Sequence, residues 1–272
     1  MLFLGTIRKA KGTSLKIAIT FLTLGSLVLV SSVYFNMQIL AFIGLSFVFW
    51  GAIFSVTRSG RFVDGSLLDS SAEAAYSTID RMINDLRFNG KGYYVPASSQ
   101  NALIPDYLKK LRSSIVFISD KDFVGLPAVE ELAAGKFLSE RSRGVFITSP
   151  GSGLLNQIER QLKLDFATIQ VSELCNLLPR CITEFFNLAK DMEMQVLNDS
   201  SVKLSVYGVL FESLYRPDNI FNSVRMLGCP VVSAVACALA KSSGKFVVVS
   251  ELMVYPKGAG VEALFSFVQV EV

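Results

Sequence analysis

The stretch that decides the architecture of this chain runs from Ile17 to Thr57 and reads IAITFLTLGSLVLVSSVYFNMQILAFIGLSFVFWGAIFSVT. It contains no charged residue. A short polar link separates two apolar runs, the first ending at Phe35 and the second beginning at Ile39. Each run has about 19 residues, so as a helix it measures roughly 28 Å, close to the thickness of a hydrocarbon core. Backbone polar groups inside a bilayer must bond to one another, so the sequence predicts a transmembrane helical hairpin.

Two other structures fit part of this pattern. Arg8, Lys9, Lys11 and Lys16 precede an apolar stretch, as basic residues do in a cleaved signal peptide. The apolar stretch is longer than the core of a usual signal peptide, and a second span follows at once, so we favour the hairpin. A buried helical hairpin in a soluble protein is the other alternative. Two uncharged runs of this length, back to back, argue against it.

The basic residues also predict the orientation of the hairpin. Four Lys or Arg residues precede the first run, Arg58 and Arg61 follow the second, and the link between the runs has none. Because Lys and Arg remain on the cytoplasmic side of a membrane, both termini are expected in the cytoplasm. We therefore expect a protein of the cell (plasma) membrane, with the lipid bilayer as a partner. The sequon Asn198-Asp199-Ser200 favours the opposite orientation, although such short patterns arise often by chance.

Composition excludes several kinds of chemistry. The 272 residues include no histidine, which excludes a Ser-His-Asp triad, a Cys-His dyad and a His-ligated metal or haem. Charged residues make up 18% of the chain, less than in an average soluble domain. Residues 1–60 hold five basic side chains and no acidic one, so the remainder is slightly acidic and no nucleic-acid partner is expected.

The cysteines are expected to be reduced core residues. They lie in apolar, helix-like contexts, and the spacings within each pair exceed those of usual metal ligands. We therefore expect no metal and no cofactor. The four are Cys175, Cys181, Cys229 and Cys237.

The chain after the hairpin is expected to form a cytosolic α+β domain. Residues 1–16 are assigned to a basic cytoplasmic N-terminus, 17–57 to the hairpin, 58–70 to a connector and 71–272 to this domain. The last two strands should form an antiparallel hairpin, so we predict a mixed or antiparallel sheet rather than a doubly wound parallel one. One domain and two halves meeting near residues 140–150 both remain open.

Periodicity and turn residues place the elements of this domain. A capping box of Ser70 and Glu73 predicts a helix start at Ser70. Further helices are predicted over 128–138, from near Gly153, over 172–196 and over 229–241. Strands are predicted over 93–95, 114–119, 144–148, 202–210, 246–255 and 262–270.

The strongest candidate for a ligand site is the segment from Gly144 to Glu159, GVFITSPGSGLLNQIE. Ser149, Gly151, Ser152 and Gly153 link a strand to a helix, and such a turn can present backbone N–H groups to an anion. The segment lacks the Lys-Ser/Thr of a phosphate-binding loop. An ordinary strand-to-helix turn with Ser152 as the N-cap explains the same residues, and we favour it.

Three carboxylates form a second candidate site. Glu212, Glu251 and Glu262 lie on or beside predicted strands in apolar contexts. Inward-pointing carboxylates would have raised pKa values and would mark a functional site, whereas strand alternation favours the solvent face. A further surface of interest is the Gly228-Cys229-Pro230 turn. No catalytic residue is assigned.

Three phrases of the sequence resemble a known family: SPGSGLLNQIERQLKLDF, ELCNLLPRCITEFFNLA and GCPVVSAVACALAKSSGKFVVVSE. They are similar to uncharacterised archaeal proteins with an N-terminal membrane hairpin and a cytosolic α+β domain. That family has no assigned activity, so the resemblance implies the architecture alone. Residues 234–270 are also similar to the end of small-molecule-sensing domains of the vinyl-reductase type, in which a helix, a strand and a hairpin close a ligand pocket. The C-terminal cysteines of those domains are absent here.

Together these patterns predict a membrane-anchored cytosolic α+β module. We expect it to bind a protein partner or a small ligand at the inner membrane surface. One alternative is a histidine-free membrane-bound enzyme that uses carboxylate, lysine or cysteine. It would show a polar pocket in which Glu251, Glu262 or Lys245 converge. Another is a subunit of a larger membrane complex, which would show an exposed apolar patch.

Overall fold

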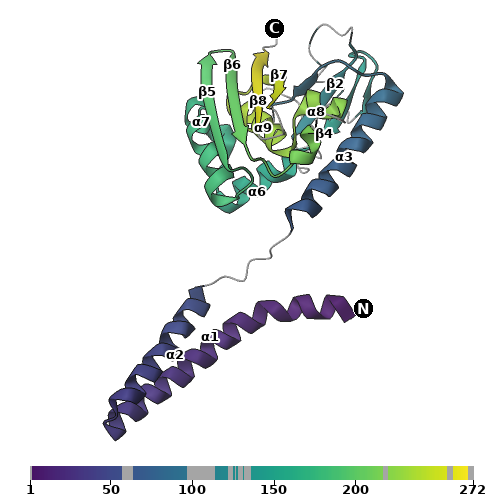
Figure 1. Ribbon diagram of the computed structural model, residues 1–272. Coiled ribbons are helices and arrows are strands. Elements are labelled where there is room, and N and C mark those ends of the chain that lie inside the picture. Colours follow the sequence, from purple (N-terminus) through teal and green to yellow (C-terminus); the bar gives the residue numbers. More distant parts are fainter. Residues whose placement is uncertain are drawn as a thin grey trace. The chain divides into compact units, whose positions relative to one another are not determined.

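The computed structural model describes residues 2–56, 64–96, 114–121, 125, 127, 131, 136–216, 220–255 and 260–268. The chain divides into two compact units, Met1–Val63 and Asp64–Val272. The first is helical and the second is α+β (Figure 1).

The first unit is a hairpin of two antiparallel helices, α1 (Leu2–Phe35) and α2 (Gln38–Val56). Asn36, in the left-handed region at φ 53°, makes the turn between them. The helices meet at glycines. A Cβ added to Gly25 would lie 2.8 Å from the backbone nitrogen of Val48, and one added to Gly44 would lie 3.0 Å from that of Leu29. The two helices therefore pack closely at Gly25 and Gly44, where the absence of a side chain allows the backbones to approach.

The second unit is built on one antiparallel sheet. Its eight strands follow the order β3-β4-β2-β1-β7-β8-β6-β5, and each pair of neighbours is antiparallel. The predicted α+β class is confirmed, and of the two predicted sheet types the antiparallel one is found. The strands are β1 (Gly92–Tyr94), β2 (Ile115–Ser119), β3 (Leu138–Ser139), β4 (Gly144–Thr148), β5 (Asp191–Asn198), β6 (Ser201–Tyr207), β7 (Phe246–Val254) and β8 (Gly260–Val268).

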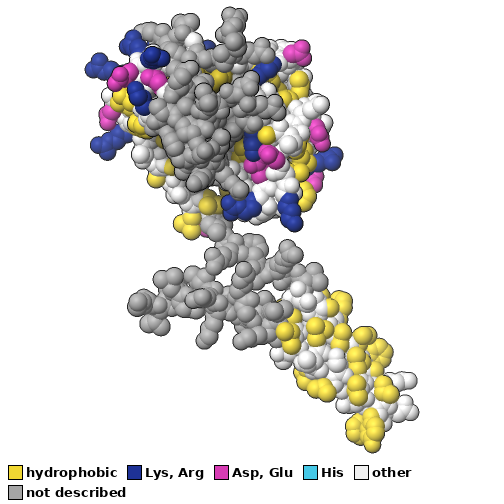
Figure 2. Space-filling model, turned by 180° about the vertical axis from the view of Figure 1, so that it is seen from behind, with side chains coloured by type: hydrophobic (Ala, Val, Ile, Leu, Met, Phe, Trp, Pro, Cys, Tyr) yellow, Lys and Arg dark blue, Asp and Glu magenta, His cyan; other side chains and the backbone are white. Residues whose placement is uncertain are grey.

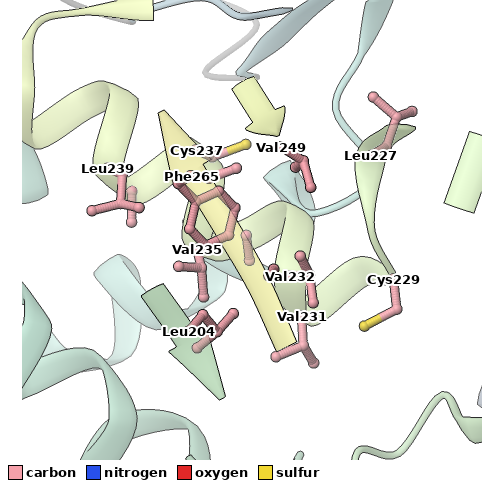
Figure 3. Packing of buried hydrophobic residues seen from close by; sticks show 14 of the residues in the cluster. Leu204, Leu227, Cys229, Val231, Val232, Val235, Cys237, Leu239, Val249 and Phe265 are labelled. Carbon is pink, nitrogen blue, oxygen red and sulfur yellow. The ribbon is translucent and has the colours of Figure 1, made fainter. Parts of the chain in front are cut away.

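One buried helix forms the centre of this unit. Helix α9 (Pro230–Ser243) contacts β1, β7 and β8 on one side and α6, α7 and η1 on the other. Side chains 231–240 of α9 are all buried. Val231, Val232 and Val235 lie close to Leu204 of β6 and Phe265 of β8 (Figure 3).

The other helical elements pack around this core. They are α3 (Gly65–Leu86), α6 (Ser152–Leu162), η1 (Phe166–Thr168), α7 (Val171–Arg180), a π-helical turn η2 (Cys181–Phe185), η3 (Glu212–Tyr215) and α8 (Asn222–Leu227).

The face of the sheet that turns away from α9 has two different halves. On β1, β2, β4 and the start of β7 it carries a second buried apolar cluster, which includes Tyr93, Phe117 and Phe146. On β5, β6, β8 and the end of β7 the same face carries polar and half-exposed side chains. Lys203 and Glu262 are examples.

Two predicted helices differ from the structure. Helix α3 begins at Gly65 and its N-cap is Asp64, whose side chain accepts a hydrogen bond from the Ser66 N–H, so the helix starts before Ser70. The helix predicted over 172–196 is wrong in its second half, because the chain leaves the helix after η2 and residues 191–198 form β5. Asn187 takes a left-handed conformation, φ 50°, between the two.

Most other predicted elements are confirmed within a few residues. The helix predicted over 128–138 falls largely outside the described residues, and its last residue belongs to β3. The end of the last predicted strand also lies outside them.

Candidate functional site

The turn predicted to bind a ligand joins β4 to α6 and packs on α9. Ser149, Gly151 and Ser152 are buried, and Gly153 is exposed. A Cβ added to Gly151 would collide with the backbone nitrogen of Ala234, so the turn touches the backbone of α9. A Cβ added to Gly153 would meet nothing within 4 Å. The N-cap of α6 is Gly151, which makes Ser152 the first residue of the helix rather than its cap.

The buried part of this turn belongs to a cluster of polar side chains that we call the hydroxyl cluster: Tyr94, Ser149, Ser233 and Cys237. The Ser149 Oγ lies 2.8 Å from the Ser233 Oγ and 2.9 Å from the Cys237 Sγ. The Tyr94 hydroxyl hydrogen-bonds to the Ser233 Oγ at 2.9 Å, and the Gly151 N–H donates to the same oxygen at 3.1 Å. The cluster therefore ties β1, the turn and α9 together inside the core.

Three buried tyrosines hold the chain just before α9, and we call them the tyrosine clamp: Tyr76, Tyr94 and Tyr215. Tyr76 donates to the Gly228 carbonyl at 2.5 Å, and Tyr94 donates to the preceding carbonyl at 2.7 Å. The Tyr215 oxygen accepts from the N–H that follows Gly228, at 2.8 Å. Residues 227–229 are buried, so the Gly228-Cys229-Pro230 turn is a packed junction rather than an open surface.

Burial sets the ionisation of these groups. It raises the pKa of all three clamp tyrosines well above the usual range. It also raises the pKa of the Cys237 thiol to about 11, although the hydrogen bond with Ser149 acts to lower it. The Cys229 pKa is raised in the same way, despite hydrogen bonds from Tyr215 and from backbone N–H groups of α9. These thiols are protonated at neutral pH, and a thiol in that state is a poor nucleophile.

All four cysteines are free and buried, as predicted. Among the described residues, no group of three or more Cys, Asp or Glu side chains is placed to hold a metal ion.

None of the three candidate carboxylates is buried: Glu212 lies in η3, Glu251 on β7 and Glu262 on β8. Glu212 and Glu251 are exposed. The Glu262 carboxylate lies 3.0 Å from the Lys203 Nζ. Hydrogen bonds from Tyr255 and then from Lys203 lower the pKa of Glu262. A buried general acid has a raised pKa, so the lowered pKa of Glu262 does not fit that role.

Sequence reasoning did not identify the tyrosine clamp or Ser233. The Tyr94 hydroxyl bonds to residues 133 and 139 positions away, and Tyr76 bonds to one 152 positions away. No local pattern marks such partners, since they are distant in the sequence.

The residues predicted to bound the membrane spans lie on the hairpin surface. Ile17 and Phe35 of α1 and Ile39 of α2 are exposed, and Thr57 lies outside the described residues. By length and composition, three helical stretches of the described chain are apolar enough to cross a membrane: Ile17–Phe35, Gln38–Ser55 and Asn222–Ser243. The third stretch is 83% buried and holds α8 and α9, so it forms the core of the α+β unit.

Comparison with known proteins gives one match. A family model described as a domain of unknown function (DUF7982) matches residues 5–257, which include most of both units. No curated protein and no solved structure matches the chain. The resemblance to an uncharacterised family is thus confirmed, and the similarity to vinyl-reductase-type domains stays a prediction.

Proposed function

Because the chain belongs to the DUF7982 family of unknown function, we propose a role from its own geometry. The α1–α2 hairpin anchors the protein in a lipid bilayer. The α+β unit is a binding module held at the cytoplasmic surface of that membrane, where it takes a protein partner or a small ligand.

The observation that carries this proposal is the apolar outer surface of the hairpin. Most of the large apolar side chains that the described residues expose belong to α1 and α2, among them Val33, Phe42 and Trp50. Figure 2 shows hydrophobic and uncharged side chains over the described part of the hairpin, whereas Lys, Arg, Asp and Glu are scattered over the α+β unit. Exposing such a surface to water is unfavourable, whereas the hydrocarbon core of a bilayer accommodates it.

The polar side chains of the hairpin also suit a bilayer. The hydroxyls of Thr23, Ser26, Ser31 and Ser46 donate to carbonyls four residues earlier in their own helix, at 2.8–2.9 Å. A hydroxyl that bonds in this way needs no partner from water.

Fluorescence of the single tryptophan tests the anchoring. Trp50 is 51% exposed on α2, so in the proposed state it contacts acyl chains. We expect strong quenching of its emission when the full chain is reconstituted in phosphatidylcholine vesicles brominated on the acyl chains. Little effect of acrylamide, a water-soluble quencher, is expected. Emission that acrylamide quenches and bromine leaves unchanged contradicts the proposal.

The orientation has its own test, because the chain carries a natural reporter. Asn198 of the sequon is exposed at the end of the β5–β6 hairpin. In translation with microsomes, the cytoplasmic orientation predicts no glycan at Asn198. An Asn198→Gln variant is the matched control. A product that gains mass only when Asn198 is present would place the α+β unit on the lumenal side.

The ligand-binding part of the proposal concerns the turn from Ser149 to Gly153. The buried groups of this turn already bond within the hydroxyl cluster. The exposed Gly153 and the first turn of α6 are therefore the part that a ligand can contact. A titration of the full chain with inorganic phosphate, followed by the amide resonance of Gly153, tests this contact. A saturable shift at Gly153 is expected. A resonance that does not move contradicts it.

A further inference from the structure

The first turn of α3 exposes two neighbouring apolar side chains. Leu67 is 66% exposed and Leu68 is 42% exposed. Further along the same helix, Tyr76 and Ile83 are buried in the core. The α+β unit exposes other adjacent apolar pairs, such as Val196 and Leu197. Among the described residues of this unit, Leu67 and Leu68 are the exposed pair nearest to the hairpin in sequence.

This turn is also the part of the α+β unit that follows the hairpin most closely in the chain. Eight residues separate Val56, the last residue of α2, from Gly65, the first of α3. The chain takes nine Cα-to-Cα steps from Val56 to Gly65, and at no more than about 3.6 Å per step the two residues lie at most roughly 32 Å apart. Arg58 and Arg61 lie within this stretch of sequence and suit an anionic headgroup region. Wherever α2 leaves a bilayer, α3 therefore begins within roughly 32 Å of that point.

Two of the three acidic residues nearest the leucines accept hydrogen bonds within the protein. The Asp64 carboxylate caps α3 through the Ser66 N–H at 3.0 Å. Asp69 accepts from the Ser213 hydroxyl at 2.6 Å. Glu73 lies one turn further along the helix and is exposed. Two of the three charges nearest the leucines are thus engaged within the protein.

Helix α3 is firmly attached to its unit. Tyr76 donates to the Gly228 carbonyl, and the Asp80 carboxylate accepts from the backbone N–H groups of Asn222 and Ser223 at 3.0 and 2.6 Å. Together with the Asp69 contact, these bonds fasten α3 along most of its length. A contact made by its first turn is therefore transmitted to the whole unit.

We propose that Leu67 and Leu68 insert into the outer part of the bilayer and so fix the orientation of the α+β unit on the membrane. This inference rests on the proposed function, since it requires a hairpin that spans the bilayer. The partner is the lipid surface itself, recognised through apolar burial at the interface.

The experiment compares single-tryptophan variants of the full chain in phosphatidylcholine vesicles brominated either near the headgroup or near the bilayer centre. Trp50→Phe combined with Leu67→Trp reports on the proposed contact. Trp50→Phe combined with Leu197→Trp is the matched control, because Leu197 is 53% exposed on β5 and far from the hairpin in sequence. The unmodified chain, with Trp50 alone, reports on the hairpin.

We expect the Leu67→Trp emission to fall by about half with bromine near the headgroup and less with bromine at the centre, as for an interfacial aromatic. The Leu197→Trp emission should stay unchanged in both. Equal quenching of the two variants, or none in either, overturns the inference while Trp50 remains quenched. Loss of quenching at Trp50 itself overturns the anchoring proposal instead, so the two failures are distinguishable.

Discussion

Gly151 is the residue at which the turn before α6 meets the backbone of α9. Any Cβ there collides with the Ala234 nitrogen, which is backbone and cannot rotate away. We expect Gly151→Ala to lower the free energy of unfolding by about 3 kcal/mol, as overpacking in a rigid core does. Chemical denaturation of the full chain in detergent measures it. Gly153→Ala is the control two residues away, where open space predicts little change.

The Tyr94 hydroxyl belongs to both the hydroxyl cluster and the tyrosine clamp. Tyr94→Phe leaves the Leu227 carbonyl without this donor at 2.7 Å and the Ser233 hydroxyl without this partner at 2.9 Å. We expect a loss of about 1–2 kcal/mol of stability, measured by the same denaturation. Tyr93→Phe is the matched variant, since Tyr93 is the preceding residue on β1 and faces the opposite side of the sheet. A larger loss for Tyr93→Phe would contradict the assigned role of the cluster.

The clamp tyrosines predict how stability depends on alkaline pH. Burial raises their pKa values in the folded protein, so the folded state resists deprotonation. The corresponding stability is complete below the unfolded tyrosine pKa of about 10 and is lost as the pH rises above it. Thermal unfolding followed by circular dichroism should show a falling midpoint above that pH. Tyr94→Phe should reduce the slope, because it removes one titrating group.

At the scale of elements, one lysine joins α9 to α6 and η1. The Lys241 Nζ lies 2.6 Å from a Glu159 oxygen and 2.8 Å from an Asp165 oxygen. Burial acts to lower the Lys241 pKa, but the bonds to Asp165 and Glu159 outweigh it and raise the pKa. Hydrogen bonding to Lys241 lowers the pKa of Asp165.

Lys241→Met should therefore lower the free energy of unfolding by about 2 kcal/mol at neutral pH, because it leaves the half-buried Glu159 carboxylate without this cation. Since the folded Asp165 pKa is lowered, its stabilising effect is present above the unfolded pKa of about 4 and is lost as the pH falls further. Urea denaturation at neutral and at acidic pH should show a smaller acid-induced loss in the variant than in the parent. If the variant and the parent lose the same stability on acidification, the proposed coupling between Lys241 and Asp165 is contradicted.

The elements that sequence patterns predicted well are those with one clear period. The GVFIT strand has the predicted limits, and the CPVVSAVACALAK helix extends over Pro230–Ser243. Strand β5 was missed because Ala189 and Met192 extend the helical stripe of α7 as well as they fit a strand. A strand is distinguished from a continued helix here because Met192 and Met194 both point into the core where β5 pairs with β6. The pairing of β5 with β6 depends on tertiary contacts, which the helical stripe of the sequence does not show.

At the scale of the whole molecule, the two units have separate cores. The α+β unit buries its sheet against α9, and the hairpin packs through its own glycines. We expect residues 64–272 expressed alone to stay in the supernatant after ultracentrifugation and to unfold cooperatively. The full chain should sediment with membranes unless detergent is added. A tail that aggregates without the hairpin would contradict the independence of the two units.

The sequence predicted the apolar hairpin and an α+β tail with a mixed or antiparallel sheet, because both depend on local composition and alternation. It identified the Ser149–Gly153 and Gly228–Pro230 turns as noteworthy without showing that both pack on α9. That meeting depends on Gly151 and Gly228, which lie far apart in the chain and approach the same helix. Side-chain hydroxyls from β1 and α3 complete the junction, and their partners are fixed only by the tertiary fold.

The three ties of α3 to the rest of its unit have a mechanical consequence. Asp69, Tyr76 and Asp80 are spaced along the helix, and each bonds to the segment that leads into α9. If the hairpin is held fixed while the tail is pulled, the load that enters through α3 passes into the rest of the unit through these bonds. Tension from the anchor would thus enter the segment that precedes α9 and reach the buried helix from the residues before Pro230.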